Sequence, residues 1–280
     1  MIALTVRFSA KPGTDFVAPM GLAIPSVSPV ETTCEGADLR VVGVPNMSQQ
    51  LLCGTVDGDQ VRLTYRYEPG GPAYPEAMFV PIDSRFTRSA AEIAPEAKAI
   101  SEAAGGGRAG LESIVNHVAG LFDYGHPEKK FYDDHDLIPQ LCGTTKGSCV
   151  DINAYLIASL RAAGFEAGYI YGPFIPEEKK TWANDMHCWV VTRCDGMVEE
   201  WDIAHHLKMG VSRVRAGLNP KPGVRVAMSH SMGWRVPALG LEDIKVMGPP
   251  LLLSNSGPVL PGDLEIGFEG FDALKAAGIG

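Results

Sequence analysis

The stretch GSCVDINAYLIASLRAAG, residues 147–164, carries the clearest local signal in the chain. Ser148 is a favourable helix N-cap, because its side-chain oxygen can accept a hydrogen bond from an unpaired backbone N–H. Apolar side chains then recur along one side, and Gly164 is typical of the position that follows a helix C-terminus. The stretch therefore predicts an amphipathic helix with Cys149 in its first turn.

A cysteine in the first turn of a helix is a candidate nucleophile. Cysteine attacks as the thiolate, and the unpaired N–H groups and positive dipole at a helix N-terminus lower the pKa of a thiol there. Gly147 allows a tight approach of the backbone, and the N–H of Cys149 can stabilise an oxyanion. For Cys149 alone, a buried helix cysteine without a chemical role is an open alternative.

Two predicted strands downstream supply candidate partners for this thiol. Residues 186–193 and 197–203 alternate in the manner of strands and flank Asp195-Gly196, a dipeptide typical of two-residue hairpin turns. Such a turn pairs Cys194 with Met197, which sets the register of the whole hairpin.

The same register brings a histidine and an aspartate together. It places Asp202 opposite Trp189, and His187 lies two residues from Trp189 on the same face. His187 and Asp202 are then diagonal neighbours, roughly 7–8 Å apart at the backbone, close enough for the carboxylate to bind the imidazole. A surface pair without chemistry is the alternative, and one bulge would break the register.

The rest of the chain predicts an α+β protein in three parts. Residues 1–82 read as a β-rich N-terminal domain, in which Asp57-Gly58-Asp59 predicts a hairpin between residues 50–56 and 61–67. Residues 83–210 hold the predicted core, with helices near 90–104 and 111–122. Residues 211–280 are predicted to complete the sheet of that core.

Composition and charge limit the possible partners. The 280 residues carry a formal net charge of -9, so nucleic acid and anionic membranes are not expected as partners. No run of 18 apolar residues and no signal peptide is recognised. The six cysteines are thinly spread, which favours reduced thiols and a cytoplasmic location.

A metal site is considered and not predicted. Several histidines and cysteines lie close together in the sequence and resemble zinc ligands by count alone: His187, Cys188, Cys194, His205 and His206. No C-x-x-C pair exists, and Cys188 points to the opposite strand face from His187. Neither a metal nor another cofactor is therefore expected.

Four motifs together resemble the transglutaminase-like superfamily, whose fold is related to papain-like cysteine proteases. The resemblance covers about residues 85–206. The β-rich segment before them also looks like the domain that precedes the core in many bacterial members. The resemblance implies a papain-like core with the nucleophile helix packed on an antiparallel sheet. The motifs are Gly147-Ser148-Cys149-Val150-Asp151, Leu160 to Ala167, His187-Cys188-Trp189-Val190-Val191 and Trp201-Asp202.

The resemblance also implies roles for individual residues. Cys149 would attack a carboxamide carbonyl, His187 would act as base and then acid, and Asp202 would orient His187. Gln140 is a candidate second oxyanion donor, and Trp182 and Trp189 are candidates to line the substrate cleft.

Two positions depart from the family pattern. Glu166-Ala167-Gly168 replaces Pro-Ala-Arg, and Asp202 leads into Ile203-Ala204-His205 rather than Pro-Thr. These departures bear on substrate choice and leave the three implied catalytic residues in place.

The expected activity is that of a cysteine hydrolase acting on peptide, protein or other amide substrates, with hydrolysis ahead of crosslinking. An arylamine N-acetyltransferase-like acyltransferase uses the same three residue types, but about 80 β-rich residues precede the core here, which argues against it. A non-catalytic binding module on the same fold is the third hypothesis. Iodoacetamide reactivity of Cys149 separates this last hypothesis from the others.

Overall fold

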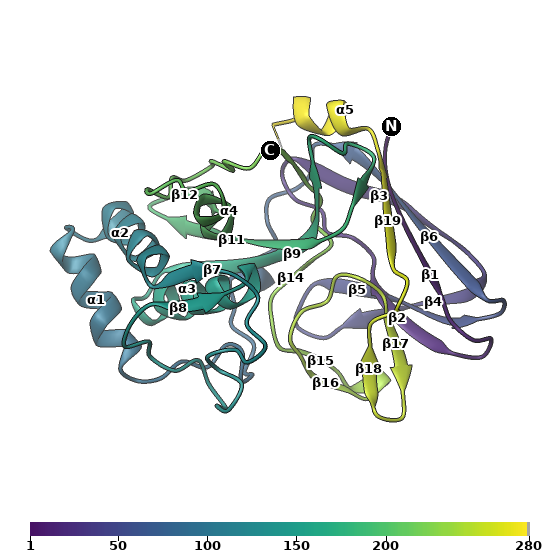
Figure 1. The fold of residues 1–280 in the computed structure, drawn as a ribbon, viewed down its shortest axis with the longest axis horizontal. Coiled ribbons are helices and arrows are strands. Elements are labelled where there is room, and N and C mark those ends of the chain that lie inside the picture. Colours follow the sequence, from purple (N-terminus) through teal and green to yellow (C-terminus); the bar gives the residue numbers. More distant parts are fainter. Residues whose placement is uncertain (279–280) are drawn as a thin grey trace.

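A computed structural model of the chain describes residues 1–278. Figure 1 shows helices gathered on one side, two facing β-sheets on the other, and the long strand β9 (Glu166–Pro176) running between them. The predicted α+β class is confirmed. The site discussed below lies where these two sides meet.

The N-terminal part forms two five-stranded antiparallel sheets. One sheet has the order β10-β19-β1-β6-β3, in which β10 is Trp182–Ala183 and β19 is Glu265–Glu269. The other has the order β18-β17-β2-β5-β4, in which β17 is Leu251–Ser254 and β18 is Gly257–Val259. Their apolar inner faces pack together, as in the edge-to-face contact of Phe8 and Phe16 at 5.2 Å between ring centroids. The strands from this part are β1 (Ile2–Ser9), β2 (Asp15–Pro19), β3 (Val27–Glu35), β4 (Ala37–Val44), β5 (Gln49–Val56) and β6 (Gln60–Pro69).

The prediction of a β-rich N-terminal segment is confirmed, but the predicted hairpin around Asp57-Gly58-Asp59 is wrong. Strand β5 pairs with β2 and β4, whereas β6 pairs with β1 and β3 in the other sheet. The turn therefore carries the chain from one sheet to the other. A turn signal alone does not distinguish a hairpin from such a crossing, because both need the same local backbone.

Three helices form the other side of the molecule. The predicted helices appear as α1 (Ile93–Ala103), α2 (Gly107–Gly120) and α3 (Cys149–Ala162). Apolar residues at helical spacing on α2, among them Leu111 and Val118, are buried against α1 and α3. No helix within residues 1–278 is long and apolar enough to cross a membrane.

A central antiparallel sheet joins the two sides. Its order is β12-β11-β9-β13, from β11 (Met186–Cys194), β12 (Met197–Trp201), β9 and β13 (Gly223–Arg225), with β14 (Ser229–His230) also paired to β9. Side chains of β11 alternate between two cores. Cys188 and Val190 face the helices, whereas Trp189 and Val191 belong to the core shared with the N-terminal sheets. The sheet is therefore buried on both faces.

The segment after residue 210 contributes strands to both N-terminal sheets and to the central sheet. Strands β13 and β14 extend the central sheet, whereas β17 pairs with β2 and β19 pairs with β1 in the N-terminal sheets. The remaining elements are the following: η1 (Glu76–Met78), β7 (Phe122–Tyr124), β8 (Thr145–Gly147), β10 (Trp182–Ala183), α4 (Ile203–Lys208), β15 (Trp234–Val236), η2 (Pro237–Leu239), β16 (Leu241–Ile244), β17 (Leu251–Ser254), β18 (Gly257–Val259), β19 (Glu265–Glu269) and α5 (Phe271–Ala276). The division at residues 82 and 210 stays a prediction.

Candidate active site

Cys149 is the first residue of α3, with Ser148 at the N-cap. The preceding residues form β8, which pairs in parallel with β7 and so holds the helix start against the aromatic residues of that strand. A Cβ atom at Gly147 would lie 2.9 Å from the Phe122 ring. Glycine is therefore needed here for close packing. The thiol is nearly buried, with 6% of Cys149 exposed.

Asp151 fastens the start of α3. One carboxylate oxygen accepts hydrogen bonds from Ser148 N at 2.9 Å and Ser148 Oγ at 2.7 Å. The other accepts from the Tyr132 hydroxyl and lies 3.3 Å from Lys245 Nζ. Burial opposes ionisation, but Lys245 and these hydrogen bonds outweigh it and hold the pKa of Asp151 below its ordinary value. The residue therefore acts as a buried, charged helix cap.

We expect Asp151→Ala to lower the free energy of unfolding by about 3 kcal/mol, because it removes the helix cap and leaves Lys245 without a carboxylate partner. Urea unfolding measures this loss as a lower midpoint at unchanged slope. Asp38→Ala, at an exposed position of β4, is the matched control and should change stability by no more than about 0.5 kcal/mol. Equal losses in the two variants would contradict the capping role.

His187 and Asp202 lie together as the hairpin register predicts. Strands β11 and β12 pair Cys194 with Met197, and this register continues to Val190 opposite Trp201. His187 Nε2 lies 2.7 Å from Asp202 Oδ2, and both side chains are at least 98% buried. Because Nε2 is bound by the carboxylate, Nδ1 is the ring nitrogen left for another partner.

The structure brings Cys149 to this pair. His187 lowers the pKa of Cys149, and Cys149 raises that of His187, so the thiol and the imidazole are near neighbours. Helix α3 supplies the sulfur from one side of β11, and the imidazole comes from the strand itself. The three residues singled out from the sequence are therefore neighbours in the structure.

The surroundings of Cys149 and His187 favour an ion pair between the two side chains. A hydrogen bond with Cys188, together with the hydrogen bond and charge of His187, overcomes burial and holds the pKa of Cys149 well below its ordinary value. Burial disfavours the imidazolium form of His187, but Asp202 and Cys149 outweigh it and raise the pKa of His187 to about 9. A thiolate beside an imidazolium is therefore the state that these surroundings stabilise at neutral pH.

Asp202 is held by groups that the sequence reading did not assign to the site. It caps α4, where Oδ1 accepts from His205 N at 3.0 Å, and Oδ2 lies 3.0 Å from His205 Nδ1. Arg225 Nη1 lies 3.6 Å from Oδ2. Burial raises the pKa of Asp202, but the charge and hydrogen bond of His187 and the contacts with His205 hold it well below the ordinary value. Asp202 is therefore a permanently charged anchor for His187.

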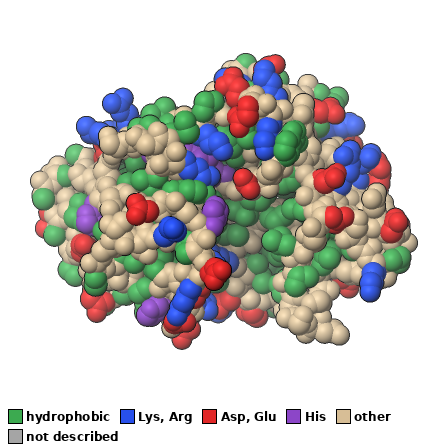
Figure 2. Space-filling model, viewed as in Figure 1, with side chains coloured by type: hydrophobic (Ala, Val, Ile, Leu, Met, Phe, Trp, Pro, Cys, Tyr) green, Lys and Arg blue, Asp and Glu red, His purple; other side chains and the backbone are tan. Residues whose placement is uncertain are grey.

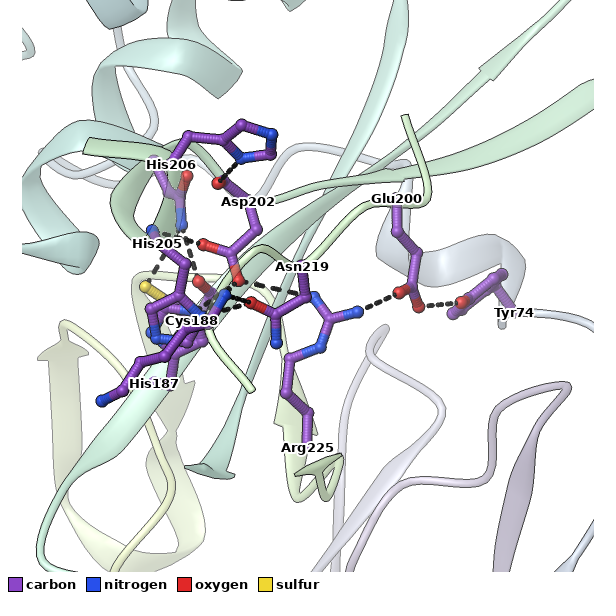
Figure 3. Close-up of polar contacts among 11 residues, drawn as sticks. Tyr74, His187, Cys188, Glu200, Asp202, His205, His206, Asn219 and Arg225 are labelled. Atoms are coloured by element: carbon purple, nitrogen blue, oxygen red, sulfur yellow. Dashed lines mark hydrogen bonds and ion pairs between the residues drawn. The ribbon is translucent and has the colours of Figure 1, made fainter. Parts of the chain in front are cut away.

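Arg225 connects this anchor to the N-terminal part. Its guanidinium lies 4.7 Å from the centroid of the Trp189 ring and binds Glu200 at 2.7 Å, and Glu200 accepts a hydrogen bond from the Tyr74 hydroxyl at 2.5 Å. Figure 3 shows this sequence of contacts from Tyr74 to Asp202. A single arginine on a three-residue strand carries no local signal, which is why sequence reasoning missed it.

His205 is the second addition to the site. Its ring stacks on the His187 ring at 3.8 Å with an interplanar angle of 5°, and its Nδ1 also lies 2.8 Å from Asn219 Oδ1. Ligand atoms of His187, Asp202 and His205 lie within 4.8 Å of one another, so a metal was considered. Each of these atoms already has a hydrogen-bond partner, and the Arg225 cation lies beside the carboxylate. The arrangement is accounted for as a hydrogen-bonded cluster.

The structure places the three tentative residues elsewhere. Gln140 Nε2 donates to Glu96 on α1 at 2.9 Å. Its amide is therefore not directed to the place beside Cys149 where a substrate carbonyl would bind. Trp182 is 45% exposed on β10, at the edge of an N-terminal sheet. Trp189 is buried beneath His187, with ring centroids 6.4 Å apart, and supports the imidazole instead of lining an open cleft. Sequence position alone could not give these side-chain directions.

The surroundings of the site are both basic and aromatic. Lys208 Nζ lies 4.3 Å from the centroid of the Tyr124 ring, and Lys221 Nζ lies 4.7 Å from that of Phe174. Figure 2 shows hydrophobic side chains between the two sides of the molecule, bordered by histidine and basic side chains.

Comparisons with known proteins agree with the sequence motifs. Residues 97–197 match the sequence model of the transglutaminase-like superfamily, a range that includes Cys149 and His187. The resemblance that the motifs indicated is thus confirmed for these residues. No curated protein sequence matches the chain.

A solved structure with a similar fold is known, and others match with lower TM-scores. A candidate cysteine protease from Cytophaga hutchinsonii aligns with a TM-score of 0.51 at 11% identity, covering 96% of this chain and 96% of that one. A candidate protease from Parabacteroides distasonis has a TM-score of 0.33 at 11% identity, covering 81% and 48%. The periplasmic domain of TgpA from Pseudomonas aeruginosa, bound to ethylmercury, has a TM-score of 0.37 at 13% identity, covering 76% and 92%. At 11% identity, the likeness to the structure from Cytophaga hutchinsonii shows the fold alone.

Proposed function

We propose that this chain, which contains a transglutaminase-like core, is a cysteine hydrolase that cleaves peptide or carboxamide bonds through an acyl thioester on Cys149. The observation that supports the proposal is the buried pair of His187 and Asp202, 2.7 Å apart, beside Cys149 at the start of α3. A nucleophile, a base and an orienting carboxylate in this order are the components of thiol acyl transfer.

The proposed reaction has two stages. The Cys149 thiolate attacks the carbonyl carbon, and the N–H of Cys149 at the helix N-terminus stabilises the oxyanion. The imidazolium of His187 then gives its proton to the leaving amine or ammonia, which forms the thioester. Water attacks the thioester, with His187 taking the proton, and the carboxylic acid and the thiolate are released. Asp202 stays ionised throughout and holds the imidazole.

Hydrolysis is proposed ahead of transfer to an amine. Water needs no dedicated binding site, whereas a crosslinking enzyme needs an acceptor site that excludes water. The substrate is proposed to be a peptide, a protein or another amide. A cytoplasmic location is also proposed, and the six cysteines, all free thiols in the structure, support it.

Labelling of the thiol tests whether the site is chemically active. We expect iodoacetamide at neutral pH to modify Cys149 on the order of 10-fold faster than a free cysteine thiol, because Cys149 is ionised there. Mass spectrometry of digested protein identifies the modified residue. Cys142 in the same digest is the internal control, because it is exposed. Preferential modification of Cys142 would contradict the proposal and favour a non-catalytic module.

Product analysis then separates the possible reactions. Peptides with and without glutamine are incubated with the protein, and new amino termini, released ammonia and acids are measured. We expect hydrolysis products even with a primary amine present. Dominant incorporation of the amine would replace hydrolysis by crosslinking, and turnover of acetyl-coenzyme A with an arylamine would favour the acetyltransferase hypothesis.

A further inference from the structure

Cys188 is a second thiol at the candidate site that the proposed reaction does not use. It follows His187 on β11 and is 0% exposed. Its side chain packs in the core between β11 and α3, whereas the His187 ring stacks with that of Trp189. Cys149, the first residue of α3, is buried in the same core, so the two thiols lie on the same side of β11.

Asn153 fixes the position of Cys188 relative to Cys149. Asn153 is four residues after Cys149, so it lies one helical turn along the same face of α3. Its Nδ2 donates to the Cys188 carbonyl oxygen at 3.0 Å and to the Cys188 sulfur at 3.3 Å. Two hydrogen bonds from Asn153 therefore hold Cys188 against α3, one helical turn from Cys149.

We propose that Cys149 and Cys188 form a modification site, at which a peroxide converts the two thiols into an intramolecular disulfide that a thiol reductant reverses. The proposal concerns the chemistry of the pair, so it does not depend on what substrate Cys149 acts on.

The reaction balances with one peroxide per pair. The Cys149 thiolate attacks one oxygen of hydrogen peroxide, the O–O bond breaks, and sulfenic acid forms with release of hydroxide. The Cys188 sulfur then attacks the Cys149 sulfur, the S–O bond breaks, and the Cys188 proton leaves with the second hydroxide as water. Two thiols and one peroxide thus give one disulfide and two water molecules.

The two cysteines have different environments, which suits these two steps. The pKa of Cys149 is held low, so Cys149 is the thiolate that reacts with peroxide. The residue is 6% exposed, which is enough for so small an oxidant to reach it. Burial raises the pKa of Cys188, so it stays a thiol until the neighbouring sulfur becomes electrophilic. Cys194, on the same strand, is held by a hydrogen bond to Asp195 instead.

Oxidation of the full chain tests the pair directly. The protein is treated with hydrogen peroxide at neutral pH, alkylated, digested without reductant and analysed by mass spectrometry. We expect a linked peptide pair containing Cys149 and Cys188, lighter by two hydrogens than the separate peptides. Dithiothreitol should restore most of the iodoacetamide labelling of Cys149.

Replacement of the second thiol gives the contrast. In Cys188→Ser the sulfenic acid has no resolving thiol, so Cys149 should proceed to sulfinic and sulfonic acids, and the labelling recovered by reductant should fall about 10-fold. Cys142→Ser and Cys194→Ser are controls that should behave as the unchanged protein. A disulfide between Cys149 and Cys142, or the same irreversible oxidation with and without Cys188, would overturn the proposal. These results are read from masses, so they stand apart from the outcome for substrate turnover.

Discussion

Replacement of Cys149 by alanine is expected to lower turnover of amide substrates by about 10⁴-fold or more, because the thioester can no longer form. The residual rate would come from the oxyanion contacts and from substrate binding alone. Initial rates at saturating and limiting substrate measure the change. We expect it in kcat, with KM nearly unchanged, since the sulfur takes part in the reaction and contributes little to binding.

The control for this variant replaces a cysteine that is not part of the proposed catalytic site. Cys194→Ala alters a half-buried thiol on β11 that binds Asp195, and it should retain the activity of the unchanged protein within about 2-fold. Circular dichroism and urea unfolding of both variants confirm that each is folded. Activity of Cys149→Ala equal to that of Cys194→Ala would rule out Cys149 as the nucleophile and remove the basis of the proposed reaction.

The elements that carry the candidate site could be predicted because their signals are local. Ser148 and Gly164 bound a helix of ordinary length, and α3 ends at Ala162, two residues before that glycine. The Asp195-Gly196 turn set the register of β11 and β12, which in turn placed Asp202 beside His187. In both cases a few neighbouring residues determine the geometry.

The contacts that support the site could not be predicted, because they join distant parts of the chain. Arg225 reaches Asp202 from a strand of only three residues, and Lys245 reaches Asp151 from the C-terminal segment. Strand β19 pairs with β1 across almost the whole length of the sequence. Local residue patterns contain no information on such pairings, since they depend on which faces remain to be covered after the individual elements form.

The direction of a side chain was the other limit. Gln140 precedes α3 in sequence but binds Glu96, because the loop before α3 packs against α1. Trp189 alternates with Cys188 and Val190 and so belongs to the core beneath His187. The alternation was predictable, but which of the two faces lay open to substrate was not.

Asp202→Asn is expected to reduce kcat on the order of 10³-fold while leaving the thiol in place. Asparagine keeps the size of the side chain but removes the negative charge that stabilises the imidazolium. His187 would then be less often protonated, and its orientation would no longer be held by a charged hydrogen bond. The thiolate of Cys149 would lose part of its stabilisation as well, because it depends on the charge of His187.

The pH dependence distinguishes this effect from simple loss of structure. In the unchanged protein the thiolate and imidazolium coexist above the lowered pKa of Cys149 and below the pKa of His187 at about 9. Turnover should therefore fall above about pH 9 as the imidazolium loses its proton, because the leaving group then has no acid. In Asp202→Asn the alkaline limit should move down by about 1–3 units and the acid limit should move up, which narrows the profile.

A neighbouring carboxylate provides the matched control. Asp185 is exposed on the turn before β11, and Asp185→Asn removes one negative charge near the site without touching His187. Its alkaline limit should stay within about 0.3 units of that of the unchanged protein, because an exposed charge is screened by solvent. Equal shifts in the two variants would mean that the field of the whole surface sets the pKa of His187. A shift confined to Asp202→Asn would assign that role to the buried contact between the carboxylate and the imidazole.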